Sequence, residues 1–210
     1  MQKQQQESIQ PLTKGEKTHL RLRAIAASEF AQRGFHNTKV SDIVLASGLS
    51  QPTFYNYFES KEAAYEELVG EFRRRLEALT KTLLIETSMS QQDLLESVGA
   101  SFLKFLDFLA EDADLTQIGF FQPPGCTATK AGLASWIARN IAKEQAIGLF
   151  RADISSTQIG KCFVGMIDQM ARDPMTPQER AAVARGCALL LCDGLWLRAC
   201  SRSSCRRSAG

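Results

Sequence analysis

The stretch GLSQPTFYNYF, residues 48–58, decides how the rest of this 210-residue chain is interpreted. Gly48 can end one helix and Ser50 can cap the next, because a Ser hydroxyl accepts a hydrogen bond from the free N–H groups of a first helical turn. Pro52 then falls in that first turn, where its missing N–H breaks no helical hydrogen bond. The stretch therefore predicts a turn followed by a short helix that runs to about Phe58.

The side chains of this short helix divide by direction. Phe54 and Phe58 are one helical turn apart, so we expect both to pack inward. The outward face carries amide, hydroxyl and phenol groups, from Gln51, Thr53, Tyr55, Asn56 and Tyr57. Gln and Asn can pair with adenine edges and hydroxyls can donate to phosphates, so this face suits a DNA groove. For Tyr57, burial within its own domain and DNA contact are equally open.

Helical periodicity precedes this stretch. Four apolar side chains predict the buried face of a helix over about 17–33, ended by Gly34 in a left-handed conformation; they are Ala24, Ala27, Phe30 and Ala31. Thr38 is then expected to cap a second, short helix with Val40, Ile43 and Val44 on its buried face. Two short helices joined by a turn and preceded by a longer one outline a helix-turn-helix DNA-binding unit.

Helical periodicity also follows it, with no convincing strand alternation. Ser60 can cap a long helix over about 61–84, and Ser90 opens another. Prolines and glycines interrupt the pattern near 119–130. Further helices are expected over about 130–148, 162–170 and 177–199. The predicted fold class is all-α: an N-terminal three-helix DNA-binding domain joined by a long helix to a larger helical body.

The stretch from Ala24 to Leu68 resembles the DNA-binding domain of the tetracycline-repressor (TetR/AcrR) family. The matching positions are Ala27, Phe30, Gly34, Phe35, Thr38, Asp42, Ile43, Ala46, Gly48, Leu49, Ser50, Tyr55, Phe58, Ser60 and Lys61. The expected organisation is a flexible arm over 1–15, a DNA-binding domain over 16–76 with its helix-turn-helix at about 39–58, a ligand-binding and dimerisation domain over 77–200, and a basic Ser/Cys-rich tail over 201–210.

The resemblance assigns roles within the DNA-binding domain. It implies that Thr38, Tyr55 and Lys61 hold phosphates. The helix dipole at the start of the fourth helix also favours an anion beside Lys61. The candidate base readers are Gln51, Pro52, Thr53 and Asn56. Lys39, Ser50 and Tyr57 complete the expected DNA-binding set. A lone histidine near this end, His36, is expected to be an exposed turn residue rather than a phosphate ligand.

The resemblance also implies that the body holds an inducer between its helices and dimerises through its last two helices. The candidate pocket residues are Phe102, Phe105, Leu106, Phe120, Phe121, Trp136, Phe163, Met166 and Met170. Each could instead be plain core, but as a set they predict a largely apolar pocket and a hydrophobic effector. The last helix is apolar on nearly every side, which predicts a two-fold dimer interface. Its candidate residues are Cys162, Leu190, Leu191, Gly194 and Leu195.

Composition narrows the function classes. Net charge is only +2, but residues 1–61 carry eight Lys/Arg and five Asp/Glu, a modest basic bias that fits a phosphate-facing domain. The body lacks His and shows no catalytic constellation, so we do not expect an enzyme. Six cysteines form no C-x-x-C pair, so neither a metal nor a cofactor is expected. A redox role for Cys200 and Cys205 stays open.

No apolar run approaches the roughly 20 residues of a membrane span, and the polar N-terminus lacks the apolar core of a secretory signal. We therefore expect a cytoplasmic protein with no membrane partner. The leading hypothesis is a dimeric, sequence-specific transcriptional regulator that represses from a palindromic operator and is released by a small, largely hydrophobic effector. The alternative is a TetR-like DNA-binding protein that acts through protein partners without a small-molecule inducer.

Overall fold

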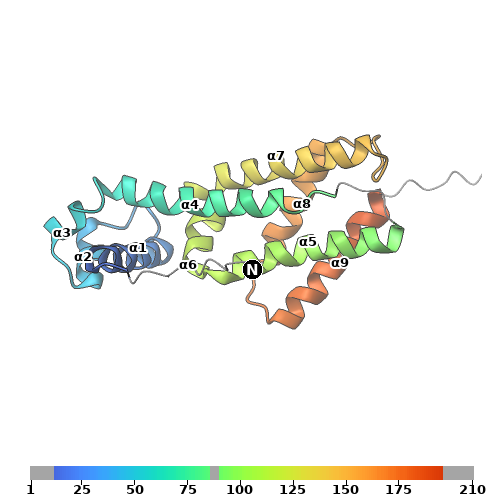
Figure 1. The fold of residues 1–210 in the computed structure, drawn as a ribbon. Helices are drawn as coiled ribbons and strands as arrows, with labels where there is room; N and C mark the ends of the chain where they lie inside the picture. Colours follow the sequence, from blue (N-terminus) through green and yellow to red (C-terminus); the bar gives the residue numbers. More distant parts are fainter. Residues whose placement is uncertain (1–11, 86–89, 196–210) are drawn as a thin grey trace, which may run out of the picture. The chain divides into compact units, whose positions relative to one another are not determined.

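The computed structural model describes residues 12–85 and 90–195, with side chains as far as Cys192, and confirms the all-α prediction (Figure 1). The first helices are α1 (Lys14–Arg33), α2 (Val40–Ser47), α3 (Gln51–Tyr55) and α4 (Lys61–Lys81). The others are α5 (Gln91–Glu111), α6 (Ala113–Thr116), the π-helical turn η1 (Gln117–Phe121), α7 (Gly125–Ala146), α8 (Ser156–Met170) and α9 (Pro177–Leu195). None of the helices in these ranges is long and apolar enough to cross a membrane.

The chain divides into two compact units. The first contains the described residues up to Phe72 together with Asp114–Cys126, and the second contains Arg73–Ala113 and the described residues from Thr127 onward. The sequence placed residues 114–126 in the C-terminal body, whereas the structure groups them with the N-terminal helices.

Helix α1 of the first unit begins earlier than predicted, because Thr13 and Glu16 form a capping box. The Thr13 hydroxyl accepts from the Glu16 N–H at 3.2 Å, and the Glu16 carboxylate accepts from the Thr13 N–H at 2.7 Å. Its buried face is formed by Leu22, Ala26, Ala27, Phe30 and Ala31. The prediction that Ala24 belongs to this face is wrong, since Ala24 is exposed.

Two glycines end the first two helices in different ways. Gly48 adopts the left-handed conformation after α2 (φ 65°, ψ 19°), which favours glycine. Gly34 has a positive φ of 77° after α1, but its ψ of 154° is extended, so the predicted left-handed cap is not formed there. The prediction that Thr38 caps α2 is wrong. Lys39 takes that position, and its N–H donates to the Asp42 carboxylate at 2.9 Å.

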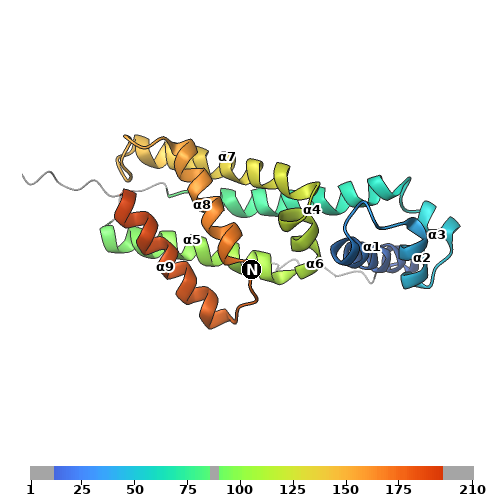
Figure 2. The same cartoon turned by 180° about the vertical axis from the view of Figure 1, so that it is seen from behind.

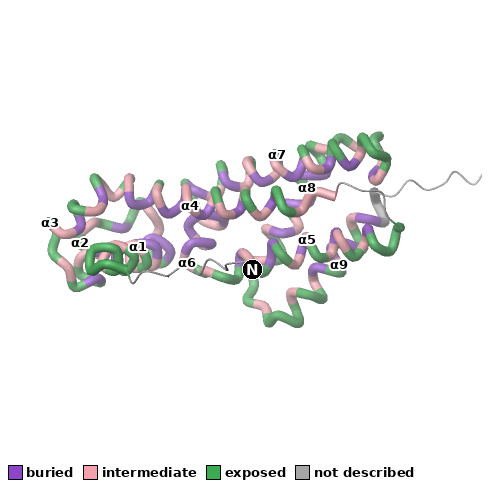
Figure 3. Tube along the Cα trace, in the orientation of Figure 1, coloured by how far each residue is buried: buried purple, intermediate pink, exposed green. Residues whose placement is uncertain are grey.

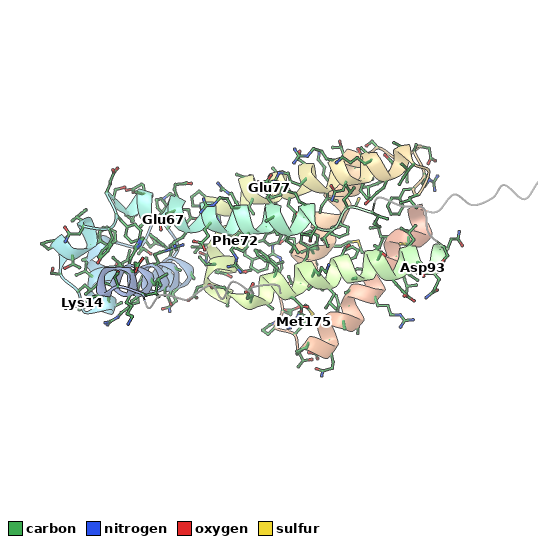
Figure 4. The ribbon with its side chains drawn as sticks, in the orientation of Figure 1. Lys14, Glu67, Phe72, Glu77, Asp93 and Met175 are labelled. Atoms are coloured by element: carbon green, nitrogen blue, oxygen red, sulfur yellow. The ribbon has the colours of Figure 1, made fainter. Side chains whose placement is uncertain are left out.

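Residues 114–126 join the first unit through buried polar contacts. The Tyr65 hydroxyl of α4 donates to the Ile118 carbonyl at 3.1 Å and accepts from the Gly125 N–H at 3.1 Å. The Gln122 amide donates to the Ala31 carbonyl at 2.9 Å, which satisfies a C-terminal carbonyl of α1. Phe72, labelled in Figure 4, packs so closely on Gly119 that a Cβ at that glycine would lie 2.7 Å from the ring. Backbone and side chain together therefore fasten this segment to α1 and α4.

The second unit is a helical bundle in which α9 packs mainly along α5, as both views show (Figures 1 and 2). Buried positions recur along α5, seen in purple in Figure 3, and they include Phe102 and Phe105. The Phe102 ring stacks on Phe163 of α8 with centroids 4.0 Å apart. Helix α7 begins at Gly125, within the stretch where a break was predicted, and α8 begins earlier than predicted because Ser155 caps it.

Candidate nucleic-acid interface and internal cavity

Local sequence positions α3 much as the opening stretch predicts. Ser50 is its N-cap: the hydroxyl accepts from the Thr53 N–H at 3.4 Å, and Pro52 lies in the first turn. The helix ends at Tyr55, three residues before the predicted end. The N–H groups of both Tyr57 and Phe58 then donate to the Phe54 carbonyl at 3.0 Å, so the chain continues as a turn.

The inward and outward faces of this segment are clearly separated. Phe54 and Phe58 are 0% and 3% exposed, with ring centroids 5.4 Å apart, so both pack inward as predicted. Four of the candidate DNA-binding side chains are exposed on the other side: Gln51, Pro52, Tyr55 and Asn56. Thr53 is half-buried, and its hydroxyl lies 2.8 Å from that of Ser50. The outward face thus presents amide and phenol groups to solvent.

Tyr57 is tied to α1. Its ring stacks on His19 with centroids 5.2 Å apart and 9° between the planes, and its hydroxyl donates to the Gly15 carbonyl at 3.2 Å. His19 in turn places Nε2 3.6 Å from a carboxylate oxygen of Glu67, which is labelled in Figure 4. Of the two alternatives for Tyr57, these contacts favour a packing role within the unit. His36, by contrast, is exposed, as expected of a turn histidine.

The two remaining phosphate-holding candidates differ in availability. The Lys61 ammonium donates to the Phe35 carbonyl at 3.0 Å and lies 4.4 Å from the centroid of the Phe35 ring, which leaves two further N–H donors. Thr38 is only 1% exposed, and its hydroxyl is directed at the carbonyls of Gly34 (2.9 Å) and Glu29 (3.2 Å). That burial is at odds with a phosphate contact by the Thr38 side chain.

Two exposed basic side chains accompany the α3 face. Lys39, the cap of α2, is exposed as expected of a candidate phosphate ligand. Arg21 of α1 was not among the predicted residues. Its guanidinium donates to the Ser47 carbonyl at the end of α2, at 2.9 Å, while the residue itself stays exposed. A single arginine on a polar helix face gives no sequence signal, so only the packing of α1 against α2 identifies it.

The second unit contains a cavity of about 50 Å³. Its walls are largely apolar, with side chains from Val98, Phe105, Ile137, Ile141, Phe150 and Phe163. Of the predicted pocket residues, only Phe105 and Phe163 line it. Phe102 and Leu106 are buried core, while Trp136, Met166 and Met170 are not part of the lining. Phe120 and Phe121 belong to the first unit. Two of the nine candidates thus line this cavity, and its walls are largely apolar.

Four polar residues also line this cavity, and none was predicted from the sequence. They are Thr80, Ser101, Asn140 and Glu144. Glu144 is 3% exposed, and one of its carboxylate oxygens accepts from the Ile85 N–H at 3.0 Å. Burial raises the pKa of Glu144, and the hydrogen bond from Ile85 opposes that rise. The four residues come from three helices, so no local sequence pattern could have grouped them.

The predicted dimer-interface residues are placed differently from one another. Leu190 of α9 is 75% exposed and Cys162 of α8 is also exposed, as an unpaired interface would require. Leu191 instead lines the cavity. Gly194 and Leu195 end α9, beyond the last described side chain, and Cys200, Cys205 and the 201–210 tail lie outside the described residues.

Comparisons with known proteins agree with the helix-turn-helix geometry. Residues 22–68 match the family described as bacterial regulatory proteins, tetR family. The chain is 40% identical over 158 residues, 75% of its length, to YdgC of Bacillus subtilis (strain 168), an HTH-type transcriptional regulator, of which it covers 81%. It is 30% identical over 144 residues, 63% of its length, to the HTH-type transcriptional repressor KstR2 of Mycolicibacterium smegmatis, of which it covers 67%.

A solved tetR-family regulatory protein from Rhodococcus RHA1 has the same fold, with a TM-score of 0.65 and 18% identity over 83% of this chain and 96% of that one. These relatives are transcriptional regulators and not enzymes. The capped α3 with its buried Phe54 and Phe58, the match over residues 22–68 and the extensive identity to YdgC together show that the chain belongs to the TetR family of transcriptional regulators.

Proposed function

We propose that this protein is a dimeric, sequence-specific repressor that binds a palindromic DNA operator through the outward face of α3 and leaves it when a small, largely hydrophobic effector enters the cavity of the second unit. The observation that carries the proposal is the division of α3. Its aromatic anchors are buried, and its amide and phenol groups face solvent. These exposed amide and phenol groups match the hydrogen-bonding groups of a major groove.

Each exposed group has a specific role in this proposal. Gln51 and Asn56 can pair with base edges, and Pro52 and Thr53 can contact a thymine methyl. The hydroxyls of Tyr55 and Ser50 donate hydrogen bonds to phosphates. The Lys39 ammonium and the two remaining N–H groups of the Lys61 ammonium bind phosphates as cations. Arg21 joins this set because it is exposed beside α2. Thr38 is left out of the proposed contacts because its hydroxyl is buried.

Dimerisation is proposed from the apolar surface of α9. Leu189 and Leu190 are 42% and 75% exposed on neighbouring positions of that helix. A two-fold dimer would cover them and would set two α3 helices about one DNA turn apart, roughly 34 Å, as a palindrome requires. Sedimentation at micromolar concentration tests this. A stable monomer would contradict it.

The DNA proposal is tested by fluorescence anisotropy with the DNA upstream of the protein's own gene and with random DNA. We expect Gln51→Ala to lose discrimination at one base pair, by about 1–3 kcal/mol, while its affinity for random DNA stays unchanged. An equal loss on both DNAs would contradict the base-reading role.

The phosphate contacts are tested through the salt dependence of binding. Lys39→Ala should weaken binding to both DNAs and reduce the slope of log K against log[salt] by about one. Lys143→Ala is the matched control, because it removes an exposed lysine from α7 in the second unit. Equal slopes for the two variants would contradict the assignment of Lys39.

The proposed effector response can be tested separately from the proposed DNA contacts. Loss of DNA binding when an apolar ligand binds to the second unit would support the inducer, through a shift between conformations with different DNA affinity. DNA binding that no cavity ligand changes would favour the alternative, in which a TetR-like protein acts through protein partners.

A further inference from the structure

The polar groups that line the cavity of the second unit have their hydrogen-bond donors engaged by backbone carbonyls and offer mainly acceptors to a ligand. The Thr80 hydroxyl donates to the Leu76 carbonyl at 2.8 Å, and the Ser101 hydroxyl donates to the Ser97 carbonyl at 3.0 Å. A hydroxyl has a single hydrogen, so each of these two groups has only lone pairs left for another partner. Both hydroxyls can therefore act toward the cavity only as acceptors.

Asn140 has the same bias. Its side-chain nitrogen donates to the Thr80 carbonyl at 3.1 Å, and since a carbonyl can only accept, this contact fixes which end of the amide is nitrogen. The amide oxygen, which is an acceptor, is then left for another partner. No described residue forms a hydrogen bond to it.

Glu144 adds a carboxyl group to this set of acceptors. One of its oxygens is held by the Ile85 N–H at 3.0 Å, and the side chain is 3% exposed in an apolar surrounding. Among the described residues that line the cavity there is no Lys, Arg or His to balance a negative charge. Burial without a cation disfavours the charged carboxylate and raises the pKa of Glu144, and a cationic ligand would favour the charged form again.

We propose that the cavity takes a positively charged amine with an apolar body, and that the Glu144 carboxylate is its counter-ion. This rests on the proposed effector function of the same cavity and names the chemical class of the effector. The ammonium group has three N–H donors, which match the acceptors offered by Glu144, Asn140 and Ser101. The apolar body packs against the aliphatic and aromatic walls, such as Ile137 and Phe105.

The same lining disfavours carboxylate ligands. An acid entering the cavity would meet Glu144 without any basic partner on the described walls, and two carboxylates in an apolar site cannot both stay charged. A neutral alcohol could donate one hydrogen bond but would leave the charge of Glu144 unbalanced. At about 50 Å³ the cavity admits a small apolar group, so short ligands are the appropriate probes.

The experiment compares hexylamine, hexanoate and hexanol, which share a six-carbon chain and differ in head group. Thermal shift and calorimetry on the full chain should give hexylamine at least about tenfold tighter binding than hexanol, and no binding of hexanoate. Equal or tighter binding of the acid or the alcohol would overturn the proposal.

Glu144→Gln supplies the second measurement. The amide oxygen of Gln can still accept from the Ile85 N–H, so the variant removes the charge and keeps the shape. Amine and alcohol should then bind the variant equally. A preference for the amine that survives in this variant would contradict the role of Glu144. If the variant fails to fold, the head-group comparison on the wild-type protein decides the question alone.

DNA-binding measurements distinguish the proposed effector function from the proposed amine class of the effector. If the acid or the alcohol binds at least as tightly as the amine and releases DNA, the proposed effector function stands and the amine class is wrong. If none of the three compounds binds, the amine proposal is wrong and the effector proposal loses its support in this cavity. The DNA-binding role is judged independently by the Gln51→Ala variant.

Discussion

Tyr65→Phe removes one oxygen atom that joins two backbone groups of the first unit. The hydroxyl donates to the Ile118 carbonyl and accepts from the Gly125 N–H, both at 3.1 Å, and the residue is 2% exposed. Each such hydrogen bond contributes about 0.5–1.5 kcal/mol net. The ring stays in place, so loss of packing adds little. We expect the free energy of unfolding to fall by about 1–3 kcal/mol.

Urea denaturation followed by circular dichroism measures this change, with the slope m compared between variants to show that the same amount of structure unfolds. Tyr55→Phe is the matched control. Tyr55 is 52% exposed, and none of the hydrogen bonds in the described structure involves its hydroxyl, so its stability should stay within about 0.5 kcal/mol of wild type. A Tyr65→Phe loss no larger than that of the control would refute the reasoning, since the two buried hydrogen bonds would then contribute nothing measurable.

Three further predictions concern packing, ionisation and capping. Gly160→Ala in α8 should lower the free energy of unfolding by about 1–3 kcal/mol, because a Cβ there would lie 2.6 Å from the Ala134 carbonyl oxygen of α7. Gly165→Ala, whose Cβ would have nothing within 4 Å, should be neutral or stabilising by up to about 1 kcal/mol. Urea denaturation measures both variants, and equal effects would contradict the steric explanation. Burial raises the pKa of Glu144 above its ordinary value of 4.5, so the contribution of this residue to stability is full below pH 4.5 and is lost as pH rises through the folded-state pKa. Glu144→Gln should therefore gain in thermal stability relative to wild type between pH 4.5 and 7. A constant difference across that range would contradict the raised pKa. Ser50→Ala removes the cap of α3 and should cost about 0.5–2 kcal/mol in denaturation and weaken operator binding, whereas unchanged values for both would show that the cap is dispensable.

The start of α3 and its buried face could be predicted because their signals are local. A cap, a proline in the first turn and two phenylalanines one turn apart fix the start of α3 and its buried face within nine residues, from Ser50 to Phe58. Thr38 shows the limit of this approach. A threonine before a helix looks like a cap, but here its hydroxyl is drawn to the Gly34 carbonyl, and that contact depends on how the preceding turn folds back.

The cavity could not be predicted residue by residue, because its polar groups are brought together by packing. Thr80, Ser101 and Glu144 lie on α4, α5 and α7, far apart in the sequence. Each on its own resembles an ordinary helix residue. The aromatic residues that the sequence did suggest, such as Trp136, are not part of the lining. An apolar composition predicts that a pocket has apolar walls, but only the packing of the helices shows which groups face the pocket.

The fastening of residues 114–126 to α1 and α4 has a consequence for protein engineering. A fragment that stops after α4 would keep the whole match to the family model, over residues 22–68, yet it would lack the partners of Tyr65 and of the Ala31 carbonyl and the backbone that covers Phe72. Grafting this specificity onto another regulator would therefore mean transplanting two separate pieces of chain. The first unit is discontinuous along the chain, although the family match over residues 22–68 is not.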